Sequence, residues 1–334
     1  MGLDAGRLVR QSIAAVRHFV RDVRAVQRER QARNTAPTDT LILFYNTMWD
    51  QPLEAEDVPL PDGCRLTTDR ARFYEAAAVV FHIPTLKDLP PEKVVGQVWV
   101  SWSLECDVHY PLLREPTIMQ WFDLTMTYRQ DADIVVTYTG VYMDGATFAQ
   151  ALRTPPRPKS ADNLASLFIS SGIDRSGRTD YATELMRHLD VHSYGKVLRN
   201  RAIPNDLGRT SKLCVVADHK FELAFENAIA EDYVTEKFFD PLMVGTVPVY
   251  LGAPNVEQFA PGDHCYINSA DFSSPEALAA YLLHLQDHAP EYAAYLAWKE
   301  RPFRPAFLAL LARQEGHAFT RLGRAVQARR SLRP

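Results

Sequence analysis

The sequence predicts an α/β protein made of two successive Rossmann-like domains. Short apolar runs suited to buried strands recur along the 334 residues, and helical segments separate several of them. A proline-rich stretch, Thr154–Ser160 (TPPRPKS), then interrupts the pattern. Prolines this dense stop both helices and interior strands, so the domain linker is placed here. The predicted parts are a basic amphipathic helix, an N-terminal α/β domain, a C-terminal Rossmann-like domain and closing helices with a basic tail, at residues 1–35, 36–155, 156–300 and 301–334.

The first half of the chain supplies the strands of the first predicted sheet. Each run is continuous in apolar residues, which is typical of a strand buried on both faces. The expected strands are Thr40–Tyr45, Ala76–His82, Val94–Ser101 and Ile134–Thr139. The helical segments between several of them favour a mostly parallel sheet.

The alternation of strands and helices restarts after the linker. Strands are expected at Leu164–Ser170, Val191–Tyr194, Lys212–Ala217 and Thr246–Leu251, and helices at Thr179–Leu189, Thr235–Val244 and Pro275–Gln286. Sheets of this kind bind ligands at the carboxyl ends of their strands. The chain has no GxGxxG and no GxxxxGK[ST] motif, which weakens a dehydrogenase or P-loop interpretation.

Charge is distributed unevenly along the chain. Residues 1–35 and 313–334 each carry a net charge of +5, so the overall net charge of −4 leaves −14 for the residues between them. An acidic body argues against nucleic-acid binding, whereas basic ends suit anionic lipid or an acidic partner. Residues 6–33 predict one arginine-rich helix. It could lie on a membrane surface, self-associate as a coiled coil or dock on its own body, and Phe319–Arg330 leaves the same alternatives open.

Several classes of protein and site are disfavoured by what the sequence lacks. No apolar run approaches the ~20 residues that span a bilayer, and the first thirty residues contain no apolar signal region, so a soluble or peripheral protein is expected. The four cysteines have no CxxC spacing and are expected to be reduced and mostly buried. The histidines show no ligand pattern, with His284 and His288 expected on a surface helix, so no metal site is predicted.

The densest cluster of polar residues is Phe225–Lys237 (FENAIAEDYVTEK), followed closely by Thr246–Pro254 (TVPVYLGAP). Glu236 and Lys237 stand near an expected helix start, where orphan N–H groups and a lysine charge would suit a diphosphate. A neighbouring carboxylate could accept hydrogen bonds from sugar hydroxyls. Spacing alone equally allows a solvated helix start with a salt-bridged Glu–Lys pair.

The FEN, DYVTEK and VPVYLG blocks of residues 225–255 resemble the donor-binding signature of the α1,3/4-fucosyltransferase family, whose members transfer fucose from GDP-fucose. Upstream, Tyr128–Tyr138 (YRQDADIVVTY) is similar to the segment that ends the first domain of that family. The resemblance covers roughly residues 75–300 and leaves out both ends of the chain. It implies the GT-B type of glycosyltransferase fold: two facing Rossmann-like domains, with the acceptor held mostly by the first domain and GDP-fucose by the second.

The resemblance also implies which residues bind the donor. Lys237 and Glu236 stand where the family's Glu-Lys pair contacts the sugar nucleotide, and Asn227 matches the asparagine of FEN. Arg178 matches an arginine that faces the diphosphate, which a guanidinium fork suits. The remaining expected donor-binding residues are Ser170, Ser171, Tyr194 and Tyr233. Ser171 departs from the asparagine that family members often have, and the two tyrosines are weaker candidates.

The catalytic base is expected from the first domain. Displacing GDP with inversion requires a group that takes the proton of the acceptor hydroxyl, and a carboxylate can do so. Within Trp99–Asp107 (WVSWSLECD), Glu105 aligns with the family's Glu-Ser-Pro pattern. Cys106 and Asp107 replace Ser-Pro here, which leaves Asp107 open as the working carboxylate. Asp131-Ala-Asp133 looks like a metal-binding DxD, but it precedes a strand in the wrong domain and is expected to cap an element and pair with Arg129.

The function implied is an inverting α1,3-fucosyltransferase acting on an N-acetyllactosamine-like, Lewis-type oligosaccharide. The alternatives are the same fold with another GDP-sugar or a surface-polysaccharide acceptor, or a non-catalytic protein that binds sugar nucleotides or glycans. No cofactor is expected to be required, and Mn²⁺ or Mg²⁺ is expected at most to stimulate. The predicted location is cytoplasmic, with the basic ends on the inner membrane, and a homodimer is left open.

Overall fold

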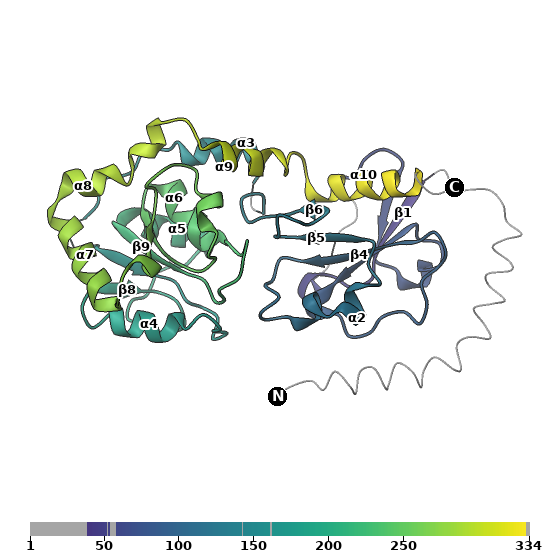
Figure 1. Ribbon diagram of the computed structural model, residues 1–334, viewed down its shortest axis with the longest axis horizontal. Helices are drawn as coiled ribbons and strands as arrows, with labels where there is room; N and C mark the ends of the chain where they lie inside the picture. The colour runs from purple at the N-terminus through teal and green to yellow at the C-terminus, as the bar shows by residue number, and fades with distance from the viewer. Residues whose placement is uncertain (1–38, 52, 54–57, 142, 161, 332–334) are drawn as a thin grey trace, which may run out of the picture. The chain divides into compact units, whose positions relative to one another are not determined.

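The computed structural model describes residues 39–51, 53, 58–141, 143–160 and 162–331 of the chain (Figure 1). Its strands are β1 (Thr40–Phe44), β2 (Cys64–Thr67), β3 (Ala78–His82), β4 (Val98–Ser103), β5 (Leu124–Thr127), β6 (Ile134–Val135), β7 (Ala165–Leu167), β8 (Val191–Ser193), β9 (Phe221–Phe225), β10 (Val247–Leu251) and β11 (Ile267–Asn268). Its α-helices are α2 (Pro116–Met119), α3 (Gly145–Leu152), α4 (Arg178–Leu185), α5 (Arg209–Asp218), α6 (Glu236–Val244), α7 (Pro275–Asp287), α8 (Ala289–Ala294), α9 (Pro305–Ala312) and α10 (Ala318–Ser331). Short 3-10 helices lie in several of the connections.

The described strands form two sheets. The first has the order β2-β1-β3-β4-β5-β6 and the second the order β11-β10-β9-β7-β8. Every strand pair of the second sheet is parallel, as are β1–β2, β1–β3 and β3–β4 of the first. Parallel neighbours require crossover connections, which the intervening helices provide for much of the second sheet. The predicted α/β class with parallel sheets is therefore confirmed.

The chain divides into two compact units, each made of more than one segment of the sequence. The first contains the residues up to Ser103, Glu115–Met126 and the residues from Phe319 on. The second contains Leu104–Arg114 and Thr127–Ala318. The segment that directly follows β4 is thus grouped with the second sheet, and this segment carries Glu105.

Helix α10 completes the core of the first unit. The ring of Phe319 lies 5.1 Å from that of Phe44 on β1, and Leu322 and Val326 are buried. A Cβ atom on Gly323 would come within 2.5 Å of the Pro61 ring, so this glycine permits the close approach of helix and chain. For Phe319–Arg330, the alternative of a helix docked on its own body is therefore the observed one. The prediction of a helix at 6–33 lies outside the described residues.

Helices cover both faces of the second sheet (Figure 1). Side chains alternate across a strand, so Phe221, Leu223 and Phe225 of β9 face one cluster while Ala224 faces the other. The first cluster includes apolar residues of α4, α7 and α8, and the second includes apolar residues of α3 and α6. This two-sided burial explains why the strands read as continuous apolar runs.

The elements expected in the second unit are found, except that one is of the wrong type, and several others, β9 among them, were not predicted. Lys212–Ala217 was expected as a strand but lies within helix α5. A short apolar run does not distinguish a buried strand from a buried helix, and here Val216 and Ala217 form the buried side of a helix. Strand β9 was not predicted as such, because Glu222 interrupts its apolar residues.

Two further properties bear on the sequence-based expectations. All four cysteines are free, with Cys106 and Cys265 buried, Cys64 half-buried and Cys214 exposed. Among the described residues, no helix combines the length and apolarity needed to cross a bilayer.

Candidate active site

The polar cluster of the sequence begins where strand β9 ends. Glu226 directly follows Phe225 and is fully buried, yet both of its carboxylate oxygens are satisfied. The backbone N–H of Thr235 donates to Oε1 at 2.7 Å, and the Thr235 hydroxyl donates to Oε2 at 2.8 Å. Thr235 is also the N-cap of α6. A Cβ atom on Gly252 would lie 2.6 Å from Cγ of Glu226, so the glycine of VPVYLG makes room for this carboxylate.

Lys237 lies among carboxylates in the first turn of α6. Its Nζ is 2.9 Å from the Thr235 hydroxyl, 3.2 Å from Oε1 of Glu236 and 3.4 Å from Oε2 of Glu226. Burial alone would lower the pKa of Lys237, but the two carboxylates outweigh it and raise that pKa. Burial alone would raise the pKa of Glu236, whereas Lys237 and Lys212 lower it to about 2. Lys237 and Glu236 are therefore both charged at neutral pH, which places a cation at the N-terminus of α6.

Glu105 belongs to the same electrostatic cluster. Burial raises the pKa of its carboxyl group, the charge of Lys237 opposes that rise, and Glu236 and Glu226 add to it. A hydrogen bond from Tyr233 also opposes the rise. A half-buried carboxyl group with a raised pKa, beside a lysine at a helix start, is an arrangement that suits a general base.

The residues that follow Glu105 are packed and paired. Cys106 is fully buried and contacts Tyr128 and Tyr233 in one apolar cluster. Burial raises the pKa of its thiol to about 11. Asp107 forms a two-point ion pair with Arg114, at 2.7 Å from Nη2 and 2.6 Å from Nε. The Cys106-Asp107 sequence thus builds a defined loop in which the carboxylate of Asp107 is occupied by an arginine.

Arg178 is 1% exposed and is held by backbone carbonyl groups. Its Nη1 donates to the carbonyl oxygen of Phe225 at 3.1 Å, and Nη2 donates to those of Ser171 and Ile173 at 3.0 and 3.2 Å. Its Nε is buried and has no partner among the described residues. Asp174 caps the same helix start, because its carboxylate accepts the N–H groups of Gly177, Arg178 and Thr179. Burial alone would raise the pKa of this carboxyl group, but hydrogen bonds to Thr179 and Ser176 lower it to about 2.

The other expected donor-binding residues follow the ends of β7, β8 and β9. Asn227 has a buried Oδ1 without a partner in the described part of the chain, so an acceptor atom is available at the end of β9. Ser170 and Ser171 are exposed, and the Ser171 hydroxyl accepts the N–H of Ile173 at 3.2 Å. Tyr194 is half-buried and stacks on Phe168, with ring centroids 5.2 Å apart at 15°.

Asp232, Gln130 and Asn255 form a hydrogen-bonded group beside the segment Glu226–Lys237, and the sequence did not predict it. Asp232, at a φ of 65°, accepts hydrogen bonds from the N–H and Nε2 of Gln130 and from Nδ2 of Asn255, each at 2.9 Å. These partners come from distant parts of the chain, so no local spacing reveals them. The one available signal was that Gln130 and Asn255 lie within segments already singled out.

In the DxD-like segment, the structure shows the expected ion pair between Asp131 and Arg129. Arg129 donates from Nε and Nη2 to the two oxygens of Asp131, both at 3.0 Å. The expected pairing of Asp131 with Arg129 is therefore confirmed, and this carboxylate is engaged by an arginine.

Comparison with known protein families shows to which family this chain belongs. Residues 158–331 match the model for the C-terminal part of glycosyltransferase family 10 (fucosyltransferase), and residues 37–139 match the fucosyltransferase N-terminal model. The chain belongs to glycosyltransferase family 10. The resemblance of the FEN, DYVTEK and VPVYLG blocks is thereby confirmed as true membership.

Curated relatives of this family-10 chain carry more than one name. It is 31% identical over 247 residues to alpha-(1,3)-fucosyltransferase B of Drosophila melanogaster, covering 70% of this chain and 56% of that protein. It is 33% identical to 4-galactosyl-N-acetylglucosaminide 3-alpha-L-fucosyltransferase 9 of Rattus norvegicus, covering 71% and 64%. It is 30% identical to GDP-fucose protein O-fucosyltransferase 3 of Canis lupus familiaris, covering 80% and 59%. The aligned region thus spans about three fifths of these relatives' length.

Solved structures share the fold of this family-10 chain. A crystal structure of an alpha1,3-fucosyltransferase with GDP-fucose matches with a TM-score of 0.55 at 16% identity, over 89% of this chain and 90% of that one. A second alpha1,3-fucosyltransferase structure matches with the same TM-score and identity, over 86% and 93%. The expected GT-B type of fold is therefore confirmed.

Proposed function

We propose that this family-10 chain is an inverting α1,3-fucosyltransferase. It would move L-fucose from GDP-fucose to a hydroxyl group of an N-acetylglucosamine or glucose unit in an N-acetyllactosamine-like, Lewis-type oligosaccharide. The observation that carries the proposal is the carboxyl group of Glu105, with its raised pKa, coupled to the Lys237 cluster at the start of α6. The names of several relatives support the choice of donor and linkage.

The proposed reaction assigns one role to Glu105. The acceptor oxygen forms a bond to the anomeric carbon of fucose as the bond from that carbon to the diphosphate oxygen breaks. The proton of the acceptor hydroxyl goes to Glu105, and GDP leaves with the electron pair of the broken bond. A carboxylate with a raised pKa is a stronger base than an ordinary glutamate, which favours this transfer near neutral pH. Asp107 is a poorer choice because Arg114 holds both of its oxygens.

The donor is proposed to lie at the ends of β7 and β9 and the start of α6. Lys237 and the N-terminal turn of α6 offer positive charge to the diphosphate. The free Oδ1 of Asn227 can accept a hydroxyl or N–H group of the donor, and Nε of Arg178 can donate to one. Glu236, Ser170, Ser171, Tyr194 and Tyr233 complete the proposed donor-binding set. Charge stabilisation of departing GDP and positioning would supply most of the rate.

The proposed transfer requires no resident cofactor. Asp131, the leading carboxylate of the DxD-like segment, is engaged by Arg129, so it offers no free ligand for an ion on the diphosphate. Added Mn²⁺ or Mg²⁺ is proposed at most to stimulate. Turnover that persists in EDTA would support this, and turnover that stops in EDTA and returns with Mn²⁺ would contradict it.

The decisive experiment measures GDP release from GDP-fucose and from GDP-mannose, with and without N-acetyllactosamine. Release from GDP-fucose that rises with acceptor and collapses in Glu105→Gln supports the donor and the base. The matched control is Glu276→Gln, an exposed carboxylate in the first turn of α7 that should leave turnover unchanged. Turnover of GDP-mannose but not of GDP-fucose would contradict the proposal that fucose is the sugar transferred. Donor binding without any GDP release would favour a non-catalytic sugar-nucleotide-binding protein.

The acceptor class is tested in the same assay. Relatives are named both as oligosaccharide fucosyltransferases and as protein O-fucosyltransferase 3. We therefore compare N-acetyllactosamine, a surface-polysaccharide fragment and a serine- and threonine-rich peptide as acceptors. GDP release that rises only with N-acetyllactosamine supports the proposed acceptor. GDP release that rises only with the polysaccharide fragment or only with the peptide would identify that compound class as the acceptor instead.

The basic residues 1–35 are proposed to contact anionic lipid on the cytoplasmic face of the inner membrane. Their net charge of +5 supports electrostatic binding, and four free cysteines agree with a reducing compartment. The test is co-sedimentation with phosphatidylglycerol vesicles. Residues 1–34 can be removed for it, whereas removing 313–334 would take away α10, whose Leu322 and Val326 are buried in the first unit. Unchanged sedimentation of the truncated chain would contradict the proposal. A homodimer stays a prediction that light scattering would decide.

A further inference from the structure

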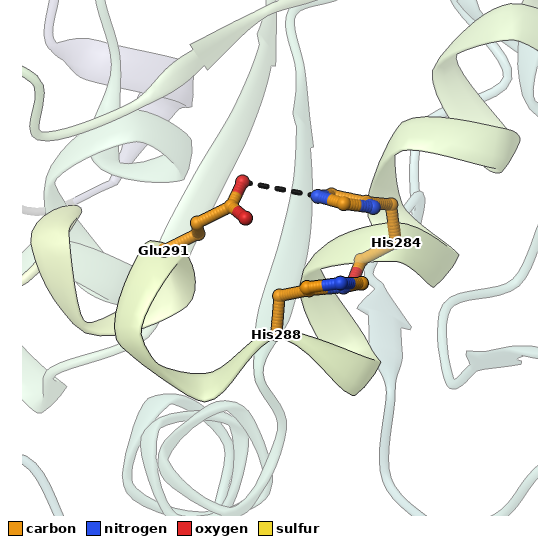
Figure 2. Close-up of side chains that lie close together, drawn as sticks. All are labelled: His284, His288 and Glu291. Atoms are coloured by element: carbon orange, nitrogen blue, oxygen red, sulfur yellow. Dashed lines mark hydrogen bonds and ion pairs between the residues drawn. The ribbon is translucent and has the colours of Figure 1, made fainter.

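One cluster of the described residues outside the candidate active site has the composition of a transition-metal site. His284, His288 and Glu291 each offer one ligand atom, and these atoms all lie within 4.8 Å of one another. Figure 2 shows the carboxylate of Glu291 facing the ring of His284, with the ring of His288 parallel beside it. Imidazole nitrogens with a carboxylate oxygen are a typical ligand set for zinc and similar ions.

The backbone already orients His288 for coordination. Its Nδ1 lies 2.7 Å from the carbonyl oxygen of His284. A carbonyl oxygen only accepts hydrogen bonds, so Nδ1 carries a proton and Nε2 is the nitrogen left to bind a metal ion. In most histidines that bind metals, the second ring nitrogen donates to a carboxylate, a backbone carbonyl group or water, which fixes the tautomer. His288 therefore presents a ligand atom without further rearrangement of its proton.

His284 and Glu291 already lie within hydrogen-bonding distance of each other. Nε2 of His284 is 3.0 Å from Oε2 of Glu291, and the rings of His284 and His288 stack with centroids 3.8 Å apart at 20°. The lone pairs of the two imidazoles lie in the planes of these nearly parallel rings, so one ring must turn about its side-chain bonds before both can bind the same ion beside the carboxylate. An ion placed there would replace the hydrogen bond between His284 and Glu291 by two metal–ligand bonds.

The three ligands stand on anchored backbone at one corner of the fold. His284 lies in the last turn of α7, His288 joins α7 to α8, and Glu291 lies in the first turn of α8. Each helix is fixed by a buried neighbour, because Leu285 is fully buried and Tyr292 is 8% exposed. The backbone is therefore ordered before an ion binds, and binding requires only rotation of the exposed side chains.

We propose that His284, His288 and Glu291 bind one divalent transition-metal ion of the zinc type, with water completing its coordination. All three side chains are exposed, so the ion enters directly from solvent. The ion would join the end of α7 to the start of α8. The proposal is independent of the transferase chemistry, because none of the three residues belongs to the candidate active site. The sequence did not reveal the site, because only the turn after α7 brings Glu291 back to the two histidines.

The test is calorimetric titration of the full-length protein with Zn²⁺, after treatment with a chelator that is then removed. We expect one equivalent to bind the unmodified chain and the affinity to fall at least about tenfold in His284→Ala, His288→Ala and Glu291→Ala. Mg²⁺ should not bind, because it prefers oxygen ligands. The matched control is His188→Ala, which removes an exposed histidine that lies 3.3 Å from Glu184 and has no third ligand among the described residues.

A second readout distinguishes coordination from a folding defect. Zn²⁺ should raise the Tm of the unmodified chain and of His188→Ala but not that of His288→Ala, while all three keep the same circular dichroism and GDP release. Co²⁺ bound at the site should give visible absorption bands typical of a four-coordinate ion. Equal Zn²⁺ affinities of the unmodified chain and His288→Ala, or an equal loss in His188→Ala, would overturn the proposal.

Discussion

The hydroxyl group of Tyr138 donates a hydrogen bond to the carbonyl oxygen of Leu104 at 2.8 Å. Leu104 is the residue before Glu105, so this bond fixes the backbone from which the proposed base projects. The ring of Tyr138 also lies 6.3 Å from that of Tyr233, which itself hydrogen-bonds Glu105. Two tyrosines therefore position the carboxyl group, one through the backbone and one directly.

Tyr138→Phe should lower kcat while leaving KM for GDP-fucose nearly unchanged. Losing one hydrogen bond of roughly 1 kcal/mol from the support of the base corresponds to a three- to tenfold fall in kcat. Steady-state kinetics with varied GDP-fucose measures both constants. Tyr281→Phe is the control, because its hydroxyl lies 2.8 Å from that of Tyr295 and joins α7 to the end of α8. A rise in KM with constant kcat would contradict a positioning role.

The acid limb of the activity profile should lie at a higher pH than the ordinary pKa of glutamate, about 4.3. Burial raises the pKa of Glu105, and the base works only when deprotonated, so kcat/KM should fall as pH drops through this raised value. The hydrogen bond from Tyr233 lowers the same pKa. Tyr233→Phe should therefore move the acid limb to still higher pH. A pH profile of kcat/KM for both chains measures this, and a shift to lower pH would rule out the assignment.

The sequence predicts those parts of the site that are local in the chain. Glu236 and Lys237 are recognisable because a helix start, a lysine and a carboxylate lie within one short block. Thr235, directly before them, proves to be the N-cap of that helix. The link from Glu105 to this block could be expected only from family resemblance, since no spacing joins residues so far apart.

What could not be predicted depends on long-range packing. Asp232 and Gln130 are 102 residues apart, and their hydrogen bonds exist only in the folded chain. The apolar run at 212–217 fits a strand or a helix equally, and only its contacts with α6 decide for helix α5. Similarly, Arg178 was expected to face a diphosphate, but sequence could not reveal that three carbonyl groups engage its guanidinium.

Thr235→Val should lower the free energy of unfolding by about 2–4 kcal/mol. The change removes the N-cap of α6 and one of two hydrogen bonds to the fully buried carboxylate of Glu226. Thr235→Ser keeps the hydroxyl group and should restore most of the loss. Urea denaturation of the three chains measures the difference. Equal losses in the valine and serine variants would show that shape, and not the hydroxyl group, matters at this position.

Arg178→Met should destabilise the fold by about 3 kcal/mol, because the buried carbonyl oxygen of Phe225 and the partly buried ones of Ser171 and Ile173 lose their donor. Arg178→Lys should recover part of this loss, since an ammonium group can still donate to some of them. Urea denaturation gives the stability, and calorimetric titration with GDP gives the affinity. An unchanged denaturation midpoint with weakened GDP binding would assign the guanidinium to the donor alone.

Stability should fall as pH rises from about 5 to 7, through the buried carboxyl group of Glu222. Burial raises its pKa from 4.5 to about 7, and Lys212 and Ser166 only partly oppose this. Because the folded chain holds this proton more tightly than the unfolded chain, the stabilisation is complete below the ordinary pKa. It is lost as pH rises through the raised one, at up to about 1.4 kcal/mol per pH unit.

Glu222→Gln isolates this contribution. The amide cannot ionise but can still accept the hydrogen bond that the Ser166 hydroxyl donates to Glu222. The variant should therefore gain stability relative to the unmodified chain at pH 8 and show little difference at pH 5. Urea denaturation at both values measures the contrast. A variant that loses more stability at pH 8 than at pH 5 would mean that the ionised carboxylate is the stabilising form, held by Lys212.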